Sequence, residues 1–185
     1  MRIFQFLAIF ILSTNFAIAQ NMEADDDPIY SATLKAILNQ EKSEKFIVWN
    51  QTIDGKTLLV SRVPRHVPDQ QFVESLPGLP LILQQRLQKE PRASLRRFDS
   101  RVNFVDTKSL YSDDAQMSAI GFSKIVYDQK HNALLYAEIC TANADAVCNG
   151  YGFWFVKTDG RWKLNKKRCL WGGYSPTSWS AEIAK

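Results

Sequence analysis

The chain has 185 residues, 45% of them hydrophobic, with 23 lysines and arginines against 19 aspartates and glutamates. A net charge of +4 without a dense basic stripe argues against a nucleic-acid-binding protein, so we expect no nucleic acid as partner. The length suits one domain with a sizeable core.

The first residues, "MRIFQFLAIFILSTNFAIAQ", have the pattern of a signal peptide. Arg2 precedes an apolar run from Ile3 to Leu12, which is only about half the length that a membrane span requires. Ala17 and Ala19 then form an A-x-A cleavage site. We therefore predict that residues 1–19 are removed before Gln20, and that the mature chain is periplasmic or secreted without a membrane anchor.

The mature chain is predicted to begin with a flexible lead-in, residues 20–27, followed by a single α+β domain, residues 28–185. Asp27 is a candidate N-cap for an amphipathic helix from Pro28 to about Lys42. The stretch 46–63 then contains two β-rich runs joined by Asp54-Gly55, which predicts a hairpin.

The middle of the chain, residues 63–100, is rich in proline and is predicted to be helical. One short helix is expected over residues 69–76 and another from Leu81 to Glu90, with Pro77-Gly78 and Pro91 ending them. A short strand, "RVNFVD", follows at residues 101–106.

The last third predicts a four-stranded antiparallel meander over residues 121–169. A two-residue turn at Asp159-Gly160 would place Lys157 opposite Trp162 and Phe155 opposite Leu164. The predicted strands are Phe122–Tyr127, Ala133–Cys140, Tyr151–Lys157 and Arg161–Arg168. The expected fold is therefore α+β: an N-terminal helix and hairpin, a helical middle and this meander.

Alternation along the strands assigns the side chains of the meander to two faces. The first is apolar and predicts a core face of Ile125, Tyr127, Leu135, Ala137, Ile139, Tyr151, Phe153, Phe155, Trp162 and Leu164. The second mixes aromatic with charged groups and collects Phe122, Lys124, Val126, Tyr136, Glu138, Trp154, Lys163, Asn165 and Lys167.

Exposed aromatic side chains among charges are enriched where partners bind, so the second face is the candidate binding surface. Two alternatives remain open. The lysines of "RWKLNKKRC" can serve to protect an edge strand, and the helix Leu81–Glu90 can cover this face and make Trp154 part of the core. The candidate binding residues are Lys124, Tyr136, Glu138, Trp154, Lys163 and Lys167.

The cysteines favour a disulfide over a metal site or a nucleophile. Cys140 and Cys148 flank one loop of a chain predicted to be exported, where thiols tend to pair. Cys148–Cys169 is the competing pair. The chain has no CxxC motif, and His131 lies nine residues along the strand from Cys140, about 30 Å away. We expect no metal and no cofactor.

The remaining enzymatic option is a carboxylate pair. Glu138 with Asp113 or Asp114 could support a periplasmic hydrolase, whereas the simpler interpretation pairs Glu138 with Lys124 or Lys163. The usual motifs of serine, metal and nucleotide sites are absent from the sequence. The sequence therefore favours a non-catalytic binding or inhibitor-type protein whose partner is an unknown protein or glycan-like ligand.

Residues 94–171 also resemble a C-terminal module of uncharacterised exported bacterial proteins. The resemblance lies in "SLRRFDSRVNFV", "NALLYAEIC", "GYGFWFVKTDGRWKL" and the following "LW". It implies export and the meander, and it implies no activity. This chain differs from the module in the two cysteines that flank the middle loop.

Overall fold

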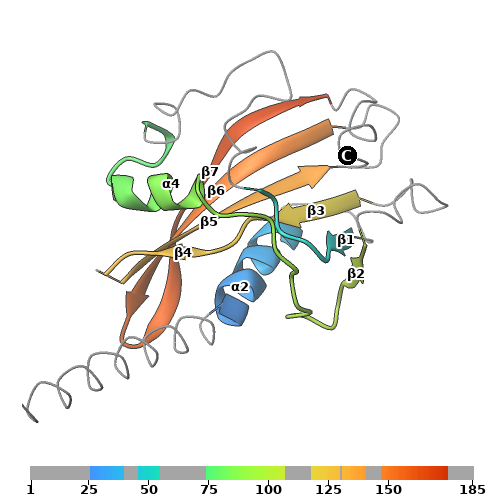
Figure 1. Ribbon diagram of the computed structural model, residues 1–185, viewed down its shortest axis with the longest axis horizontal. Helices are drawn as coiled ribbons and strands as arrows, with labels where there is room; N and C mark the ends of the chain where they lie inside the picture. The colour runs from blue at the N-terminus through green and yellow to red at the C-terminus, as the bar shows by residue number, and fades with distance from the viewer. Residues whose placement is uncertain are drawn as a thin grey trace, which may run out of the picture.

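The computed structural model describes residues 26–39, 46–54, 74–106, 118–129, 131–140 and 147–174. These residues form two helices, α2 (Asp26–Leu38) and α4 (Leu81–Leu87). The strands are β1 (Phe46–Trp49), β2 (Asn103–Val105), β3 (Ser118–Phe122), β4 (Val126–Tyr127), β5 (Asn132–Cys140), β6 (Val147–Thr158) and β7 (Arg161–Tyr174), and Figure 1 shows their arrangement.

The strands form one mixed sheet of seven, in the order β2-β1-β3-β5-β6-β7, with β4 beside β5. Strand β1 runs parallel to both β2 and β3, and the pairs from β3 to β7 are antiparallel. The short strand β2 and the long strand β7 therefore lie at opposite edges of the described sheet (Figure 1).

The predicted fold class is wrong in its architecture, although helices and an antiparallel region are both present. The sheet dominates, and the described part of the middle holds the seven-residue helix α4 and only two further helical residues, at 74–75. The meander is not a separate unit, because β1 and β2 extend its sheet on the β3 side. Parallel pairing joins segments that are distant in sequence, which local patterns do not indicate.

The first predicted strand of the meander, Phe122–Tyr127, is also wrong. Strand β3 ends at Phe122, and the two-residue strand β4 begins at Val126. Ser123 lies between them, and its hydroxyl oxygen accepts a 2.9 Å hydrogen bond from the backbone N–H of Tyr136. This side chain substitutes for a backbone partner of β5 at the point where the strand is interrupted.

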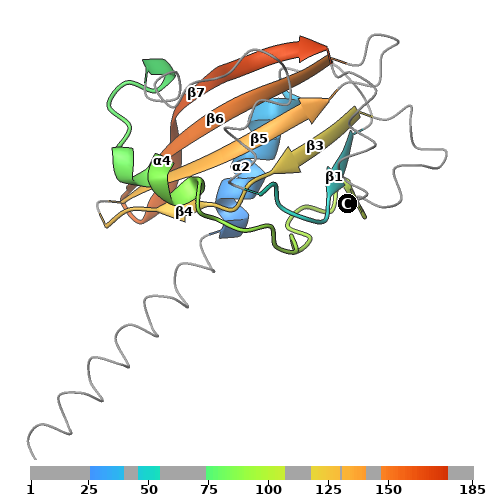
Figure 2. The same ribbon diagram turned by 45° about the horizontal axis from the view of Figure 1, so that its top comes forward.

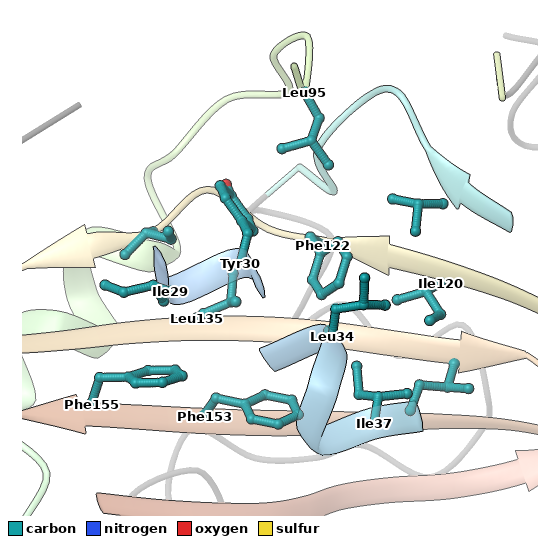
Figure 3. Packing of buried hydrophobic residues seen from close by; sticks show 14 of the residues in the cluster. Ile29, Tyr30, Leu34, Ile37, Leu95, Ile120, Phe122, Leu135, Phe153 and Phe155 are labelled. Carbon is teal, nitrogen blue, oxygen red and sulfur yellow. The ribbon is translucent and has the colours of Figure 1, made fainter. Parts of the chain in front are cut away.

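Helix α2 packs on one face of the sheet. It begins at Asp26, two residues before the prediction, and ends at Leu38 instead of Lys42. Asp26 and Asp27 lie in its first turn, where carboxylates interact favourably with the positive end of the helix. As Figure 3 shows, the apolar side chains of the helix meet the phenylalanines of the sheet. The fully buried members include Ile29, Leu34, Ile37, Phe122, Phe153 and Phe155.

Helix α4 lies on the opposite face, so that the sheet separates two apolar cores (Figure 2). Leu83 and Leu87 of the helix are buried, as are Leu76 and Leu79 before it. They pack with sheet residues that include Ile47, Ala119, Val126, Leu134, Tyr136 and Leu170. The predicted helix Leu81–Glu90 is confirmed in position, and it ends at Leu87.

One further prediction is confirmed, and others concern residues that the structure does not describe. The strand predicted at residues 101–106 is confirmed as β2, Asn103–Val105. Residues 1–25, the second half of the predicted 46–63 hairpin, and most of the helix predicted at 69–76 lie outside the described part. Within the described part, neither helix is long and apolar enough to cross a membrane.

The β6–β7 hairpin has the predicted two-residue turn. Asp159 and Gly160 adopt φ angles of 53° and 73°, as the tight hairpin turn requires. Lys157 pairs with Trp162 and Phe155 with Leu164, so the predicted register is confirmed next to the turn. The register then shifts between Trp154 and Phe155, and again between Gly150 and Tyr151.

Candidate functional site

The six predicted binding residues do not form one surface. Tyr136 is 1% exposed and belongs to the core between the sheet and α4. Its hydroxyl donates a 2.9 Å hydrogen bond to Glu138 and accepts a 2.7 Å bond from the indole N–H of Trp171. Glu138 is itself only 9% exposed. Neither Tyr136 nor Glu138 can meet a macromolecular partner without rearrangement.

Trp154 is half-buried in the same core. Its ring packs against the backbone of Gly78, where an added Cβ would lie 3.6 Å from the indole. Its N–H donates a 3.0 Å hydrogen bond to the side-chain oxygen of Asn132. The segment that carries α4 thus covers this face, which is the alternative that the sequence left open.

The three lysines of the predicted surface point to different places. The Lys124 ammonium forms a 3.3 Å ion pair with Glu90 in the loop after α4. Lys167 lies over the rings of Tyr151 and Phe153, 4.5 and 5.3 Å from their centroids, on the α2 side of the sheet. Lys163 is exposed, and it alone keeps the predicted position on the α4 side.

A different set of basic residues lies together on β7. The register shift near Asn165 places Lys166 opposite Trp154 and Arg168 opposite Gly152, while Lys163 pairs with Val156. Trp154 and Gly152 pair with Leu134 and Tyr136, which belong to the α4-side core. Four cationic residues therefore follow one another along the α4 side of β7. We call this set the basic row: Arg161, Lys163, Lys166 and Arg168.

The basic row is open to solvent. Arg161, Lys163 and Arg168 are exposed, and Lys166 is half-buried. The ion pairs between described residues lie elsewhere and join Arg96 to Asp27, Arg101 to Asp99 and Lys124 to Glu90. Strand β7 also ends the strand order of the described sheet, so its outer edge has no described strand beside it.

Two explanations fit a row of cations on an edge strand. Lysines and arginines there discourage edge-to-edge association between copies, which is a general protective device. They also create a positive potential that attracts an acidic partner. The run "RWKLNKKRC" was the only sequence signal for the row. Strict alternation from the turn placed Lys167 in the set and left Lys166 and Arg168 out.

The hydrogen-bonded cluster around Tyr136 depends on a glycine. A Cβ added at Gly150 would lie 2.1 Å from the Trp171 indole nitrogen and 2.5 Å from the Tyr136 hydroxyl. Only a residue without a side chain leaves room for the two groups to meet there. This cluster fixes the buried Glu138 carboxylate on β5. Asp113 and Asp114 lie outside the described residues, so the carboxylate-pair hypothesis stays a prediction.

The predicted disulfide is confirmed. Cys140 and Cys148 are directly paired on β5 and β6, and their sulfur atoms are bonded. Cys169 is a free thiol on β7, opposite Tyr151. Partial burial raises the pKa of the Cys169 thiol, and a backbone hydrogen bond with Trp171 and the positive charge of Lys167 act in the opposite direction. Cys169 is therefore protonated and weakly nucleophilic at neutral pH.

Searches against protein-family models, curated proteins and solved structures return no match to this chain. The resemblance of residues 94–171 to the module of exported bacterial proteins therefore stays a prediction.

Proposed function

We propose that this chain is an exported, non-catalytic binding protein that holds an acidic segment of a protein partner along β7. The observation that carries the proposal is the basic row, which gathers four cations on one side of an edge strand. No other described strand offers both a cationic face and an open edge.

The spacing of the row suits an extended partner. Alternate residues on one side of a strand lie about 6.6 Å apart, and a peptide added at the sheet edge has the same repeat. Acidic side chains at alternate positions of the peptide would then face the basic row, while backbone hydrogen bonds to β7 supply affinity. Charge complementarity of this kind chiefly raises the association rate and the specificity.

Export is supported by two features. The residues before Gln20 have the pattern of a cleaved signal peptide. The disulfide between Cys140 and Cys148 is the kind of bond that persists in oxidising compartments. Both features support a periplasmic or secreted location.

A defined peptide tests the proposal. The probe is a short fluorescent peptide in which glutamate alternates with valine, and the matched probe carries glutamine in place of glutamate. Fluorescence anisotropy should detect binding of the acidic probe alone, and the affinity should fall as salt is added. The double charge reversal K163E/K166E should abolish binding. The control K35E/K89E makes the same change in net charge at exposed lysines on the helix α2 and just after α4, and it should keep binding.

Three outcomes would oppose the proposal. Equal binding of the glutamate and glutamine probes would show that the charges of the row are not used. If neither probe binds and K163E/K166E instead associates into dimers or aggregates, the row protects the edge of the sheet. Binding of an acidic polysaccharide in place of the peptide would replace the proposed protein partner by a glycan.

A further inference from the structure

A cavity of about 530 Å³ lies on the other side of the sheet from the basic row, at the N-terminal end of α2. Its walls come from α2, from the segment after α4 and from the turn between β3 and β4. Small-molecule sites commonly have volumes of about 300–1,000 Å³. The cavity is therefore large enough for a small ligand, and it contains none of the residues of the basic row.

One wall of the cavity is held rigidly. The backbone N–H of Thr52 donates a 2.8 Å hydrogen bond to the Ala93 carbonyl, and the Leu95 N–H donates a 2.7 Å bond to Asn50. The Thr52 hydroxyl accepts a further 2.9 Å bond from the Ala93 N–H. Residues 93–95 are thereby joined to residues 50–52, just after β1, by a short antiparallel bridge.

An ion pair lies at each end of this wall, and the two pairs have opposite polarity. At one end the wall supplies the carboxylate, since Glu90 meets the Lys124 ammonium at 3.3 Å. At the other end the wall supplies the cation, since Arg96 meets Asp27 of α2 at 3.0 Å. All four side chains line the cavity and keep a third or more of their side-chain surface exposed. Pairs that are so accessible are weak, and a ligand can replace one partner at small cost.

Between the two ion pairs the lining is aromatic and hydroxylic. Tyr30 and Tyr127 are buried, 5% and 8% exposed. The Tyr30 hydroxyl donates a 3.0 Å bond to the Ser123 carbonyl, and the Tyr127 hydroxyl donates to Asp26. Burial, followed by the negative charges of Asp26 and Asp27, raises the pKa of Tyr30. Tyr30 therefore stays neutral and gives the cavity an uncharged aromatic surface between the two ion pairs.

We propose that the cavity binds a short peptide with free termini, its ammonium group toward Glu90 and its carboxylate toward Arg96. A ligand with negative charges only would face the carboxylates of Asp26, Asp27 and Glu90, and one with positive charges only would face Lys124 and Arg96. A dipolar ligand can meet an opposite charge at each end of the wall, while its uncharged middle lies over the two tyrosines. The alternative is that the cavity holds only water and that the ion pairs merely attach α2 and the β3–β4 turn to the wall.

Calorimetric titration of the full chain with trialanine tests the proposal. Trialanine should bind, and blocking either terminus, by N-acetylation or by C-terminal amidation, should weaken binding about tenfold or more. Glu90→Gln and Arg96→Gln should each have a similar effect. Glu74→Gln and Arg92→Gln are the matched controls, because both side chains are exposed and neither lines the cavity. Lys124→Gln removes the ammonium that competes for Glu90, so it should strengthen trialanine binding, and it provides a second variant if Glu90→Gln folds poorly.

The outcomes separate this proposal from the function assigned to the basic row. The K163E/K166E variant should bind trialanine as the wild type does, since its changes lie on the opposite face. No heat of binding up to about 10 mM trialanine would overturn the proposal, as would equal binding of the blocked peptides. Unchanged affinity in both Glu90→Gln and Arg96→Gln would also overturn it, because the ligand would then lie elsewhere.

Discussion

Trp154 of β6 lies opposite Lys166 of β7, whereas strict alternation from the Asp159-Gly160 turn would pair it with Asn165. The shift of one residue changes the chemistry of both sides of β7. It turns Lys167 toward Tyr151 and Phe153 on the α2 side and brings Lys166 and Arg168 into line with Lys163. An irregularity of this kind re-aims side chains without changing the sheet.

The glycine beneath the Tyr136 cluster gives the first prediction. Gly150→Ala should destabilise the protein by about 2–3 kcal/mol, because the new methyl group would overlap the Trp171 indole and the Tyr136 hydroxyl. Urea unfolding measures the change. Gly160→Ala is the control: it meets no neighbour, and its cost of about 1 kcal/mol comes only from the positive φ angle. Equal effects of the two substitutions would contradict the close contact at Gly150.

The hydroxyl of Tyr136 gives the second prediction. Tyr136→Phe removes the acceptor of the Trp171 N–H and a donor to Glu138. A buried polar group that is left without a hydrogen-bond partner costs about 1–3 kcal/mol, so the free energy of unfolding should fall by that amount. The near-ultraviolet circular dichroism of Trp171 should also change. A variant as stable as the wild type would indicate that the cluster contributes no net stability.

The disulfide gives the third prediction. Cys140 and Cys148 are 8 positions apart, and closing so short a loop stabilises the folded state by about 2.5 kcal/mol in the chain-entropy model. A C140S/C148S variant should unfold at a correspondingly lower urea concentration, and Cys169→Ser should unfold like the wild type. Peptide mapping without reduction should recover the 140–148 link. A 148–169 link would instead support the competing pair.

The fold illustrates which features a single sequence can supply. The Asp159-Gly160 turn, the register next to it and the disulfide follow from local chemistry, and each is confirmed. The core face is also largely confirmed, except that Leu164 is 39% exposed and that Phe122, assigned to the other face, is buried beside α2. The interruption at Ser123 explains the error at Phe122, because the chain ceases to alternate there.

The features that sequence analysis did not predict depend mainly on contacts between segments far apart in the chain. Phe46–Trp49 and Asn103–Val105 are both β-prone, yet nothing in either segment indicates that they pair in parallel with each other. The position of α4 over Trp154 likewise depends on packing between segments far apart in the chain. The basic row depends on one bulge residue, which no local preference of Asn165 specifies.

Acid stability gives the fourth prediction. Hydrogen bonds from Arg101 lower the pKa of Asp99 from its usual 3.8 to about 2. The carboxylate therefore stays ionised in the folded chain at a pH where the unfolded chain is protonated. This stabilisation is complete above pH 3.8 and is lost as the pH falls toward 2. Urea midpoints measured across this range should fall more steeply in the wild type than in Asp99→Asn or Arg101→Gln, and parallel curves would contradict the pair.

We propose that partners bind on the basic row and that Trp154 is a packing residue. The most direct test compares Trp154→Ala with K163E/K166E in two measurements, the thermal midpoint and the affinity for the glutamate–valine peptide. Trp154→Ala should lose about 3 kcal/mol of stability and keep its affinity per folded molecule. K163E/K166E should keep its midpoint within a few degrees and lose binding. If Trp154→Ala instead keeps its stability and loses the peptide, the claim is contradicted and the binding surface lies at Trp154.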